Sequence, residues 1–281
     1  MSYAAFRPTY PPSLYQTVLA YHRGPRKLLV DLGCGHGLIS REMSKQFDRV
    51  ISTDPSPGMV KQAQTQSPAS EFPNVEFRVA AAEGLPFVED ESVDMVVAGQ
   101  AAHWFRYDIV FPELKRILRK GGTLAFWGYK DHVYIGYPKA SALVQKYFYG
   151  DDPERNLGKY WEPGRFIVRN KLREVRPPED LYEDVTRVEY EPNPVAANSG
   201  EGTMFMTKEM TLGQSKDYVR TASSFHEWER KHPESKSRSS GGSGDVVDLM
   251  YDEMSAAEGW DDDDMKLQLE WGSAIVMARR R

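Results

Sequence analysis

Residues 28 to 37 have the sequence Leu-Leu-Val-Asp-Leu-Gly-Cys-Gly-His-Gly, an apolar run that contains Asp31 and continues into three closely spaced glycines. The apolar run predicts a buried strand, and the glycines permit the positive φ angles and close backbone approach of a ligand-binding turn. A second apolar run ends at Asp54. Because open α/β sheets bind ligands at the carboxyl ends of their parallel strands, this arrangement predicts a nucleoside pocket in which Asp54 holds the ribose diol.

The spacing of the glycines distinguishes two kinds of cofactor. A dinucleotide-binding turn has glycines in the order G-x-G-x-x-G, whereas Leu38 occupies the third of these positions here and Gly37 comes one residue early. NAD is therefore disfavoured. A helix that begins near Gly37 is expected to direct its free backbone N–H groups into the crevice. An ordinary glycine-rich turn is the alternative interpretation, and the acids on both strands argue against it.

Composition limits the class of protein. The 281 residues, 40% of them hydrophobic, are enough for one domain with an insertion or a cap. A net charge of -5 and the lack of a long basic stretch argue against nucleic-acid and membrane partners. Without a secretion signal or a run of about 18 apolar residues, we expect a cytoplasmic protein. The single cysteine, Cys34, excludes an internal disulfide and is expected beside the ligand rather than as a nucleophile.

Apolar runs alternate with helix-like stretches in the first half of the chain, as in a parallel α/β sheet. A helix is expected after Ser13, and a second one should end at Lys120-Gly121-Gly122. The strands are expected at residues 28–32, 50–53, 75–80, 93–98 and 123–127.

The second half has weaker patterns. Residues 128–178 are aromatic, basic and interrupted by prolines, so we expect an irregular cap over the crevice. Alternating polarity at residues 185–190 and 268–277 predicts an antiparallel pair at the sheet edge. Between them we expect a helix at 215–231, a flexible loop at 237–244 and, at 261–264, an acidic solvated turn rather than a metal site.

Three further segments follow in order, namely Ala-Ala-Glu-Gly-Leu-Pro-Phe at 81–87, Gly-Gln-Ala-Ala-His-Trp-Phe at 99–105 and Leu-Arg-Lys-Gly-Gly at 118–122. Together with the glycine-rich turn they resemble class I methyltransferases of type 11, which use S-adenosylmethionine. The resemblance implies an α/β Rossmann-like fold, with a seven-stranded, mostly parallel sheet, an antiparallel edge hairpin and a helical substrate cap. It divides this single domain into a lid and helix at 1–26, a cofactor-binding core at 27–130, a cap at 131–183 and edge strands with a helical insertion at 184–281.

Other segments look like fungal trans-aconitate methyltransferases, and this similarity spans nearly the whole chain. They are Arg-Pro-Thr-Tyr-Pro at 7–11, His-Trp at 103–104, Trp-Gly-Tyr at 127–129, Tyr-Trp-Glu-Pro-Gly-Arg at 160–165 and Asp-Tyr-Val-Arg-Thr at 217–221. The resemblance implies S-adenosyl-L-methionine as cofactor, S-adenosyl-L-homocysteine as product and a small carboxylic acid as methyl acceptor. A monomer and a dimer are both compatible with the sequence.

The resemblance also implies the cofactor contacts. Asp31 faces the methionine ammonium, Gln100 and Ala101 flank the methionine portion, and Arg7 and Tyr10 fold over the cofactor as a lid. Many relatives carry an adenine-binding acid where this chain has Ala81, so adenine is expected to contact backbone near Ala82, Glu83 or water. The full expected set is Arg7, Tyr10, Asp31, Gly33, Cys34, Gly35, Asp54, Ala82, Glu83, Gln100 and Ala101.

An acid acceptor requires cations but no general base. A carboxylate, with a reference pKa of about 4, is already ionised at neutral pH, unlike a phenol at about 10. Arg165 and Arg169 are four residues apart, so on a helix they would present two guanidinium groups to one carboxylate. The alternative is that they are solvated or paired with Glu162 and Glu174.

His103 follows the fourth predicted strand and is expected to face the transferred methyl group, as a base, as a hydrogen-bond donor or as a structural residue. A basic role would favour a secondary-metabolite O-, S- or N-methyltransferase, and a non-catalytic S-adenosylmethionine-binding module is the alternative of another class. No catalytic residue is assigned. The expected substrate-binding set, which includes aromatic pocket walls, is His103, Trp104, Tyr129, Trp161, Arg165 and Arg169.

Overall fold

The structure is a computed structural model that describes residues 8–281, and the chain forms two compact units. The core unit contains residues 12–129, 167–188 and 274–281, and the second unit contains residues 8–11, 130–166 and 189–273. Each unit is described by itself below. The segment expected as a cap, 131–183, contributes residues to both units.

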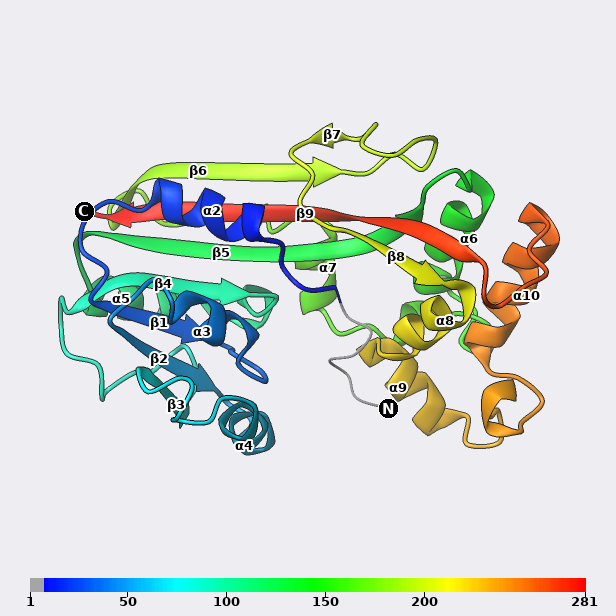
Figure 1. The fold of residues 1–281 in the computed structure, drawn as a ribbon, viewed down its shortest axis with the longest axis horizontal. Helices are drawn as coiled ribbons and strands as arrows, with labels where there is room; N and C mark the ends of the chain where they lie inside the picture. Colours follow the sequence, from blue (N-terminus) through cyan, green and yellow to red (C-terminus); the bar gives the residue numbers. More distant parts are fainter. Residues whose placement is uncertain (1–7) are drawn as a thin grey trace. The chain divides into compact units, whose positions relative to one another are not determined.

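The core unit is built on parallel strands in the order β3-β2-β1-β4-β5, followed by β9 and β6 (Figure 1). Strand β1 pairs in parallel with both β2 and β4, β2 pairs with β3, and β4 pairs with β5. The five predicted strands are confirmed as β1 (Leu28–Leu32), β2 (Arg49–Asp54), β3 (Val75–Val79), β4 (Val93–Gly99) and β5 (Leu118–Tyr134). Because these strands are parallel, their carboxyl ends lie at one edge of the sheet.

The two predicted edge strands are also present, as β6 (Tyr182–Glu191) and β9 (Lys266–Arg280), which are neighbours in the sheet. Two short strands of the second unit were not predicted, β7 (Glu201–Gly202) on β6 and β8 (Thr207–Thr211) on β9, and both pairings are antiparallel. The sheet in residues 8–281 therefore has nine strands rather than seven. Neither strand has an apolar pattern from which it could be predicted, because β7 has only two residues and β8 has the mostly polar sequence Thr-Lys-Glu-Met-Thr.

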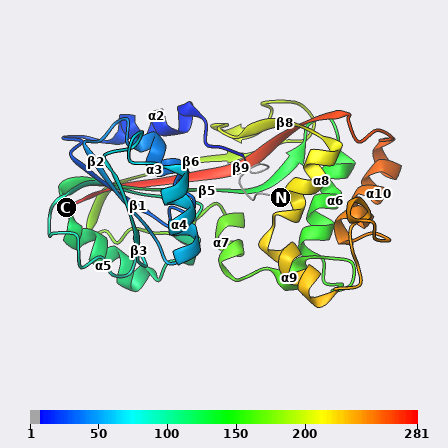
Figure 2. The same cartoon turned by 60° about the horizontal axis from the view of Figure 1, so that its bottom comes forward.

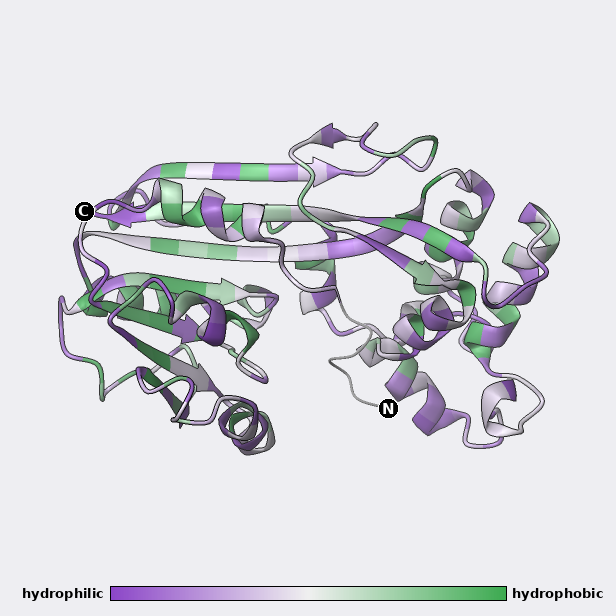
Figure 3. Ribbon diagram, viewed as in Figure 1, coloured by the Kyte–Doolittle hydropathy of each residue, from purple (hydrophilic) through white to green (hydrophobic). Residues whose placement is uncertain are grey.

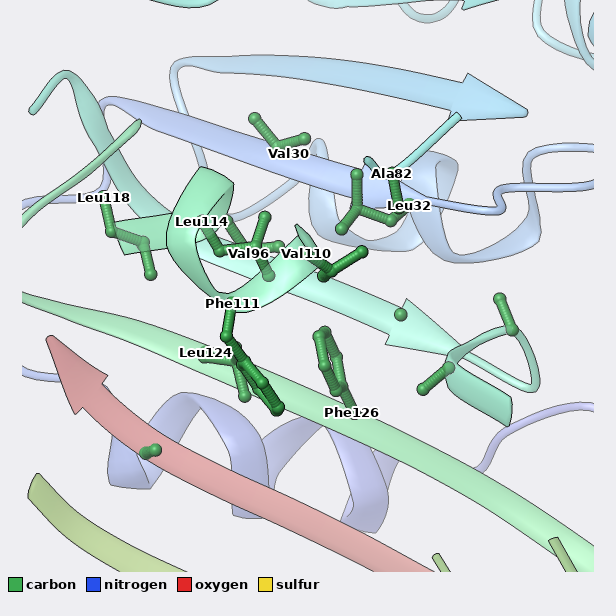
Figure 4. Close-up of a cluster of buried hydrophobic side chains, with 14 of the residues drawn as sticks. Val30, Leu32, Ala82, Val96, Val110, Phe111, Leu114, Leu118, Leu124 and Phe126 are labelled. Carbon is green, nitrogen blue, oxygen red and sulfur yellow. The ribbon is translucent and has the colours of Figure 1, made fainter. Parts of the chain in front are cut away.

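Helices of the core unit cover both faces of its parallel strands. Figure 2 shows α2 (Pro12–Tyr21) and α5 (Tyr107–Ile117) on opposite sides. Most residues of β4 are hydrophobic (Figure 3), and all but the last are buried. In the core cluster, Val110, Phe111 and Leu114 of α5 pack with strand residues such as Val96 and Phe126 (Figure 4). The core unit also contains α3 (Leu38–Met43), α4 (Pro57–Gln66) and the short η1 (Ala102–Trp104).

The predicted end of α5 is wrong by several residues. The helix ends at Ile117, and Lys120, Gly121 and Gly122 lie inside β5. Buried Leu118 already pairs with Val93, and the register then shifts by the time Met95 pairs with Thr123. The glycines therefore accommodate an irregular strand start rather than a helix end.

The second unit is more regular than expected. After β5 it contains α6 (Pro138–Tyr149), whose buried Ala140, Val144 and Tyr147 form one helical face. The expected helix at 215–231 is two helices, α8 (Leu212–Arg220) and α9 (Ser223–Lys231). The unpredicted α10 (Val246–Glu258) begins at a capping box formed by Asp245 and Asp248. The remaining elements are η2 (Gly158–Tyr160), η3 (Arg238–Ser240) and α7 (Gly164–Arg169), which contributes residues to both units.

Among residues 8–281, no helix combines the length and the hydropathy that a membrane span requires.

Candidate active site

The turn between β1 and α3 has the geometry that its glycines predict. Gly33, Gly35 and Gly37 have φ angles of +64°, +53° and +82°. A Cβ at Gly33 would lie 2.4 Å from the Cβ of Ala101, whereas a Cβ at Gly35 would meet no described atom within 4 Å. Gly33 is therefore required by packing, and Gly35 leaves open space beside the backbone that a ligand can approach.

Asp31 is a fully buried acid that is only partly satisfied by the protein. Its Oδ2 accepts a hydrogen bond of 2.6 Å from Ser40 Oγ, and its Oδ1 has no hydrogen-bond partner among the described residues. Burial, with a further contribution from the charge of Asp54, raises the pKa of Asp31 to about 7. A buried carboxylate oxygen without a partner is costly unless a ligand cation satisfies it.

Asp54 lies at the end of β2, beside the same turn. Its Oδ2 accepts from the backbone N–H of Gly35 and its Oδ1 from that of Ser56, both at 2.9 Å. These bonds fix the orientation of the carboxylate, and each oxygen retains a lone pair for a further donor such as a sugar hydroxyl. An ammonium acceptor at Asp31, a diol acceptor at Asp54 and open space at Gly35 form a donor set that fits S-adenosylmethionine.

The neighbouring predicted residues have mainly structural contacts. Burial raises the pKa of the Cys34 thiol well above its usual value, so the thiol is neutral and a poor nucleophile. The side chain of Ala82 is part of the hydrophobic core, which leaves its backbone for ligand contact. Glu83 Oε1 accepts from the backbone N–H of Arg106, the residue before α5, at 3.0 Å. One oxygen of Glu83 is therefore used at the start of this helix.

Gln100 connects the carboxyl end of β4 to Tyr129, which lies within β5. Its side-chain Nε2 donates to the backbone oxygen of Tyr129 at 2.9 Å, and its Oε1 accepts from the N–H of Tyr129 at 2.8 Å. The residue has a φ of +55°, a conformation that a non-glycine residue adopts only when its surroundings hold it. Both side-chain groups of Gln100 are thus used to position Tyr129, a role that the sequence did not predict.

The other predicted substrate residues of the core unit follow these strands. His103 and Trp104 lie in η1, with ring centroids 4.7 Å apart, and Trp104 is 52% exposed. Tyr129 is buried within β5, and Arg169 is the partly exposed last residue of α7.

Trp161 and Arg165 belong to the second unit, where Arg165 is held by three neighbours. It forms an ion pair with Asp131, its Nε donates to the hydroxyl of Tyr149 at 3.1 Å, and its guanidinium lies 4.6 Å from the centre of the Trp161 ring. Burial lowers the pKa of Arg165, but the Asp131 carboxylate together with the Tyr149 and Tyr218 hydroxyls outweighs this effect, so the guanidinium is charged. Burial alone would raise the pKa of the Asp131 carboxyl, but the charge of Arg165 helps to keep this pKa below its usual value.

This pairing differs from the expected alternative partners of Arg165, which were Glu162 and Glu174. Glu174 instead accepts a hydrogen bond from Asn170. Asp131 is 34 positions from Arg165, so no local sequence pattern indicates the pair. Of the two expected lid residues, Arg7 lies outside the described residues, and Tyr10 is a half-buried residue of the second unit.

Comparisons with known proteins indicate the family of the chain. Residues 30–126 match the family model described as a methyltransferase domain. The chain is 31% identical, over 288 residues, to a probable S-adenosylmethionine-dependent methyltransferase of Saccharomyces cerevisiae, with 99% of this chain and 94% of that protein covered. It is 32% identical over 186 residues to a putative methyltransferase of Dictyostelium discoideum, with 66% of this chain and 65% of that protein covered. A solved structure of a putative type II methyltransferase from Anaeromyxobacter dehalogenans has a TM-score of 0.71 and 26% identity over 98% of both chains.

Proposed function

The chain belongs to the S-adenosylmethionine-dependent methyltransferases, and from this membership we propose that it methylates an oxygen of a small carboxylic acid, with a tricarboxylate of the trans-aconitate type as first choice. The Rossmann-like fold, the enzymatic activity and the cofactor follow from the family. The acid substrate and the roles of individual residues are the proposal.

The cofactor supplies a methyl group that its sulfonium already activates. The residues of the chain must therefore bind, orient and exclude water rather than generate a strong nucleophile. In this proposal Asp31 binds the cationic amino group through Oδ1, Asp54 binds the ribose hydroxyls, and Gly35 allows close backbone approach. Gln100 acts on the site by holding Tyr129.

The observation that best supports an acid substrate is the charged guanidinium of Arg165, whose side chain is 14% exposed, lies on an aromatic ring and is oriented by Asp131. Guanidinium groups are the preferred partners of carboxylates. Burial also raises the pKa values of the Cys34 thiol and the Tyr149 phenol, which makes both groups weak candidates for a base at neutral pH. A carboxylate acceptor needs no base, so these features are consistent with ester formation.

The test uses S-adenosylmethionine with a deuterated methyl group and a panel of tricarboxylates, dicarboxylates, phenols, thiols and amines, with products identified by mass spectrometry. We expect a labelled, base-labile methyl ester of an acid, and we expect His103→Ala to retain turnover within about tenfold, because general-base catalysis contributes 10²–10⁴-fold where it is needed. Methylation of only a phenol, thiol or amine, with a loss of more than about 100-fold in His103→Ala, would contradict the proposal. Cofactor binding without transfer to any member of the panel would contradict it as well.

A further inference from the structure

Ser40 is a buried serine of α3 whose hydroxyl contacts the acid of the neighbouring strand. Its Oγ donates to Oδ2 of Asp31 at 2.6 Å, and both residues are 0% exposed. The hydrogen bond lies within the core unit and joins the two sides of the glycine-rich turn. The other carboxylate oxygen, Oδ1, has no hydrogen-bond partner among residues 8–281. The two oxygens of Asp31 are therefore unequal, because the protein uses one and leaves the other unused.

The helix itself does not require a hydroxyl at position 40. Alanine is the better helix former and has no polar group to satisfy. A helical serine can donate to the carbonyl four positions back, which here belongs to His36 and already accepts from Arg41 Nη1 at 2.7 Å. Ser40 donates to Asp31 instead, across the turn rather than along its own helix. The hydroxyl therefore acts on the carboxylate.

The surroundings of Asp31 otherwise oppose its negative charge. Burial and the charge of Asp54 raise the pKa of Asp31, and the hydroxyl of Ser40 is the largest influence that lowers it. Two further titratable groups interact electrostatically with Asp31, the Tyr15 phenol of α2 and the Cys34 thiol of the turn; burial raises the pKa of each, so both are neutral near pH 7. Among the described residues, Ser40 is thus the side chain that stabilises the ionised form of Asp31.

We propose that Ser40 is a positioning residue for cofactor binding: its hydroxyl holds Oδ2 of Asp31 and thereby reserves Oδ1 for the cationic amino group of the cofactor. This inference rests on the role that the proposed function gives to Asp31. Since Oδ2 already accepts a hydrogen bond, a proton that Asp31 takes up at low pH is directed to Oδ1. The proton and the amino group then compete for one atom, and binding of the amino group releases that proton to solvent.

Ser52 provides a matched control. It is also a serine of the core unit that is 0% exposed, and in the parallel register of β1 and β2 it pairs with Asp31 itself. Its Oγ, however, has no hydrogen-bond partner in the part of the chain that the structure describes. Removal of this hydroxyl therefore changes the same neighbourhood by the same atom without removing a hydrogen bond to Asp31.

The experiment measures the dissociation constant of S-adenosylhomocysteine by isothermal titration at pH 6 and pH 8.5, together with the melting temperature, for the full-length wild type, Ser40→Ala and Ser52→Ala. Loss of the hydrogen bond should raise the pKa of Asp31 by about one pH unit. We therefore expect Ser40→Ala to bind about tenfold more weakly than the wild type at pH 6, but less than about twofold more weakly at pH 8.5. Ser52→Ala should bind as the wild type does at both pH values.

A double-variant cycle separates action through Asp31 from a structural role of Ser40. Asp31→Asn removes the charge, so adding Ser40→Ala to it should weaken binding by less than about twofold at pH 6. Carbon-13 NMR titration of the Asp31 carboxyl in the ligand-free protein measures the same hydrogen bond without cofactor. We expect its midpoint to be about one pH unit higher in Ser40→Ala than in the wild type.

The inference is overturned if Ser40→Ala loses the same affinity at both pH values, loses none at either, leaves the NMR midpoint unchanged or fails to fold. A loss in the Asp31→Asn background as large as in the wild type, or the same pH-dependent loss in Ser52→Ala, would overturn it as well. A wild type whose affinity does not change between pH 6 and pH 8.5, or an Asp31→Asn protein that binds as tightly as the wild type, would instead refute the proposed role of Asp31. The NMR midpoints keep the two failures apart, because they report the action of Ser40 on the carboxylate without any ligand.

Discussion

Cofactor affinity should depend on the protonation of Asp31, whose pKa burial raises to about 7 in the free protein. The ionised carboxylate binds the cationic amino group, so affinity decreases as the pH falls through 7. The amino group of the free ligand stays protonated throughout this acidic range, so the acidic limb reports Asp31 alone. With this pKa, the affinity is about tenfold lower at pH 6 and about 100-fold lower at pH 5 than for the fully ionised carboxylate.

Isothermal titration with S-adenosylhomocysteine between pH 5 and pH 8.5 measures this profile. Repeating it at pH 6 in buffers of different ionisation enthalpy reports the release of a proton from Asp31 on binding. Asp31→Asn should bind weakly and lose the acidic limb of the profile. Asp54→Asn should also bind more weakly but keep that limb. A dissociation constant that stays constant from pH 5 to pH 7.4 in the wild type would refute the assignment of Asp31 as the group that receives the amino group.

Three further predictions concern the site. Gly33→Ala should lower the free energy of unfolding in urea by more than about 2 kcal/mol, because a Cβ at this position has no room. Gly35→Ala should mainly weaken S-adenosylhomocysteine binding in titrations. Equal effects of the two substitutions on stability and on binding would contradict these roles. Gln100→Ala removes two hydrogen bonds to backbone and should cost about 1–3 kcal/mol in urea unfolding, and an unchanged midpoint would show that this contact is unimportant. Arg165→Met leaves the buried carboxylate of Asp131 without its cation and should lower the free energy of unfolding by about 3–5 kcal/mol. Adding Asp131→Leu should restore stability but not acid methylation. Recovery of activity in the double variant would exclude a substrate role for the pair.

The core unit was predictable because its signals are local. Each of its first four strands is a short segment rich in apolar or β-branched residues, and the positive φ angles of Gly33, Gly35 and Gly37 follow from residue type. Parallel pairing then places Asp31 and Asp54 at one edge of the sheet without further information. These local features are the basis of the cofactor prediction.

The second unit was harder to predict because its order depends on contacts between distant residues. The apolar face of α6 combines Ala140 and Val144 with the aromatic Tyr147, and it follows a strand, β5, that is longer than its apolar core suggests. Arg165 was selected as a cation from its spacing to Arg169, but its partner Asp131 is distant in sequence.

The most direct test of the account is a crystal structure of the protein with S-adenosylhomocysteine. We predict that the amino group of the ligand lies within hydrogen-bond distance of Asp31 Oδ1, the buried oxygen that no described residue satisfies, and that both ribose hydroxyls contact Asp54. A complex in which Asp31 Oδ1 remains without a partner, or in which the ribose contacts a residue other than Asp54, would contradict the account.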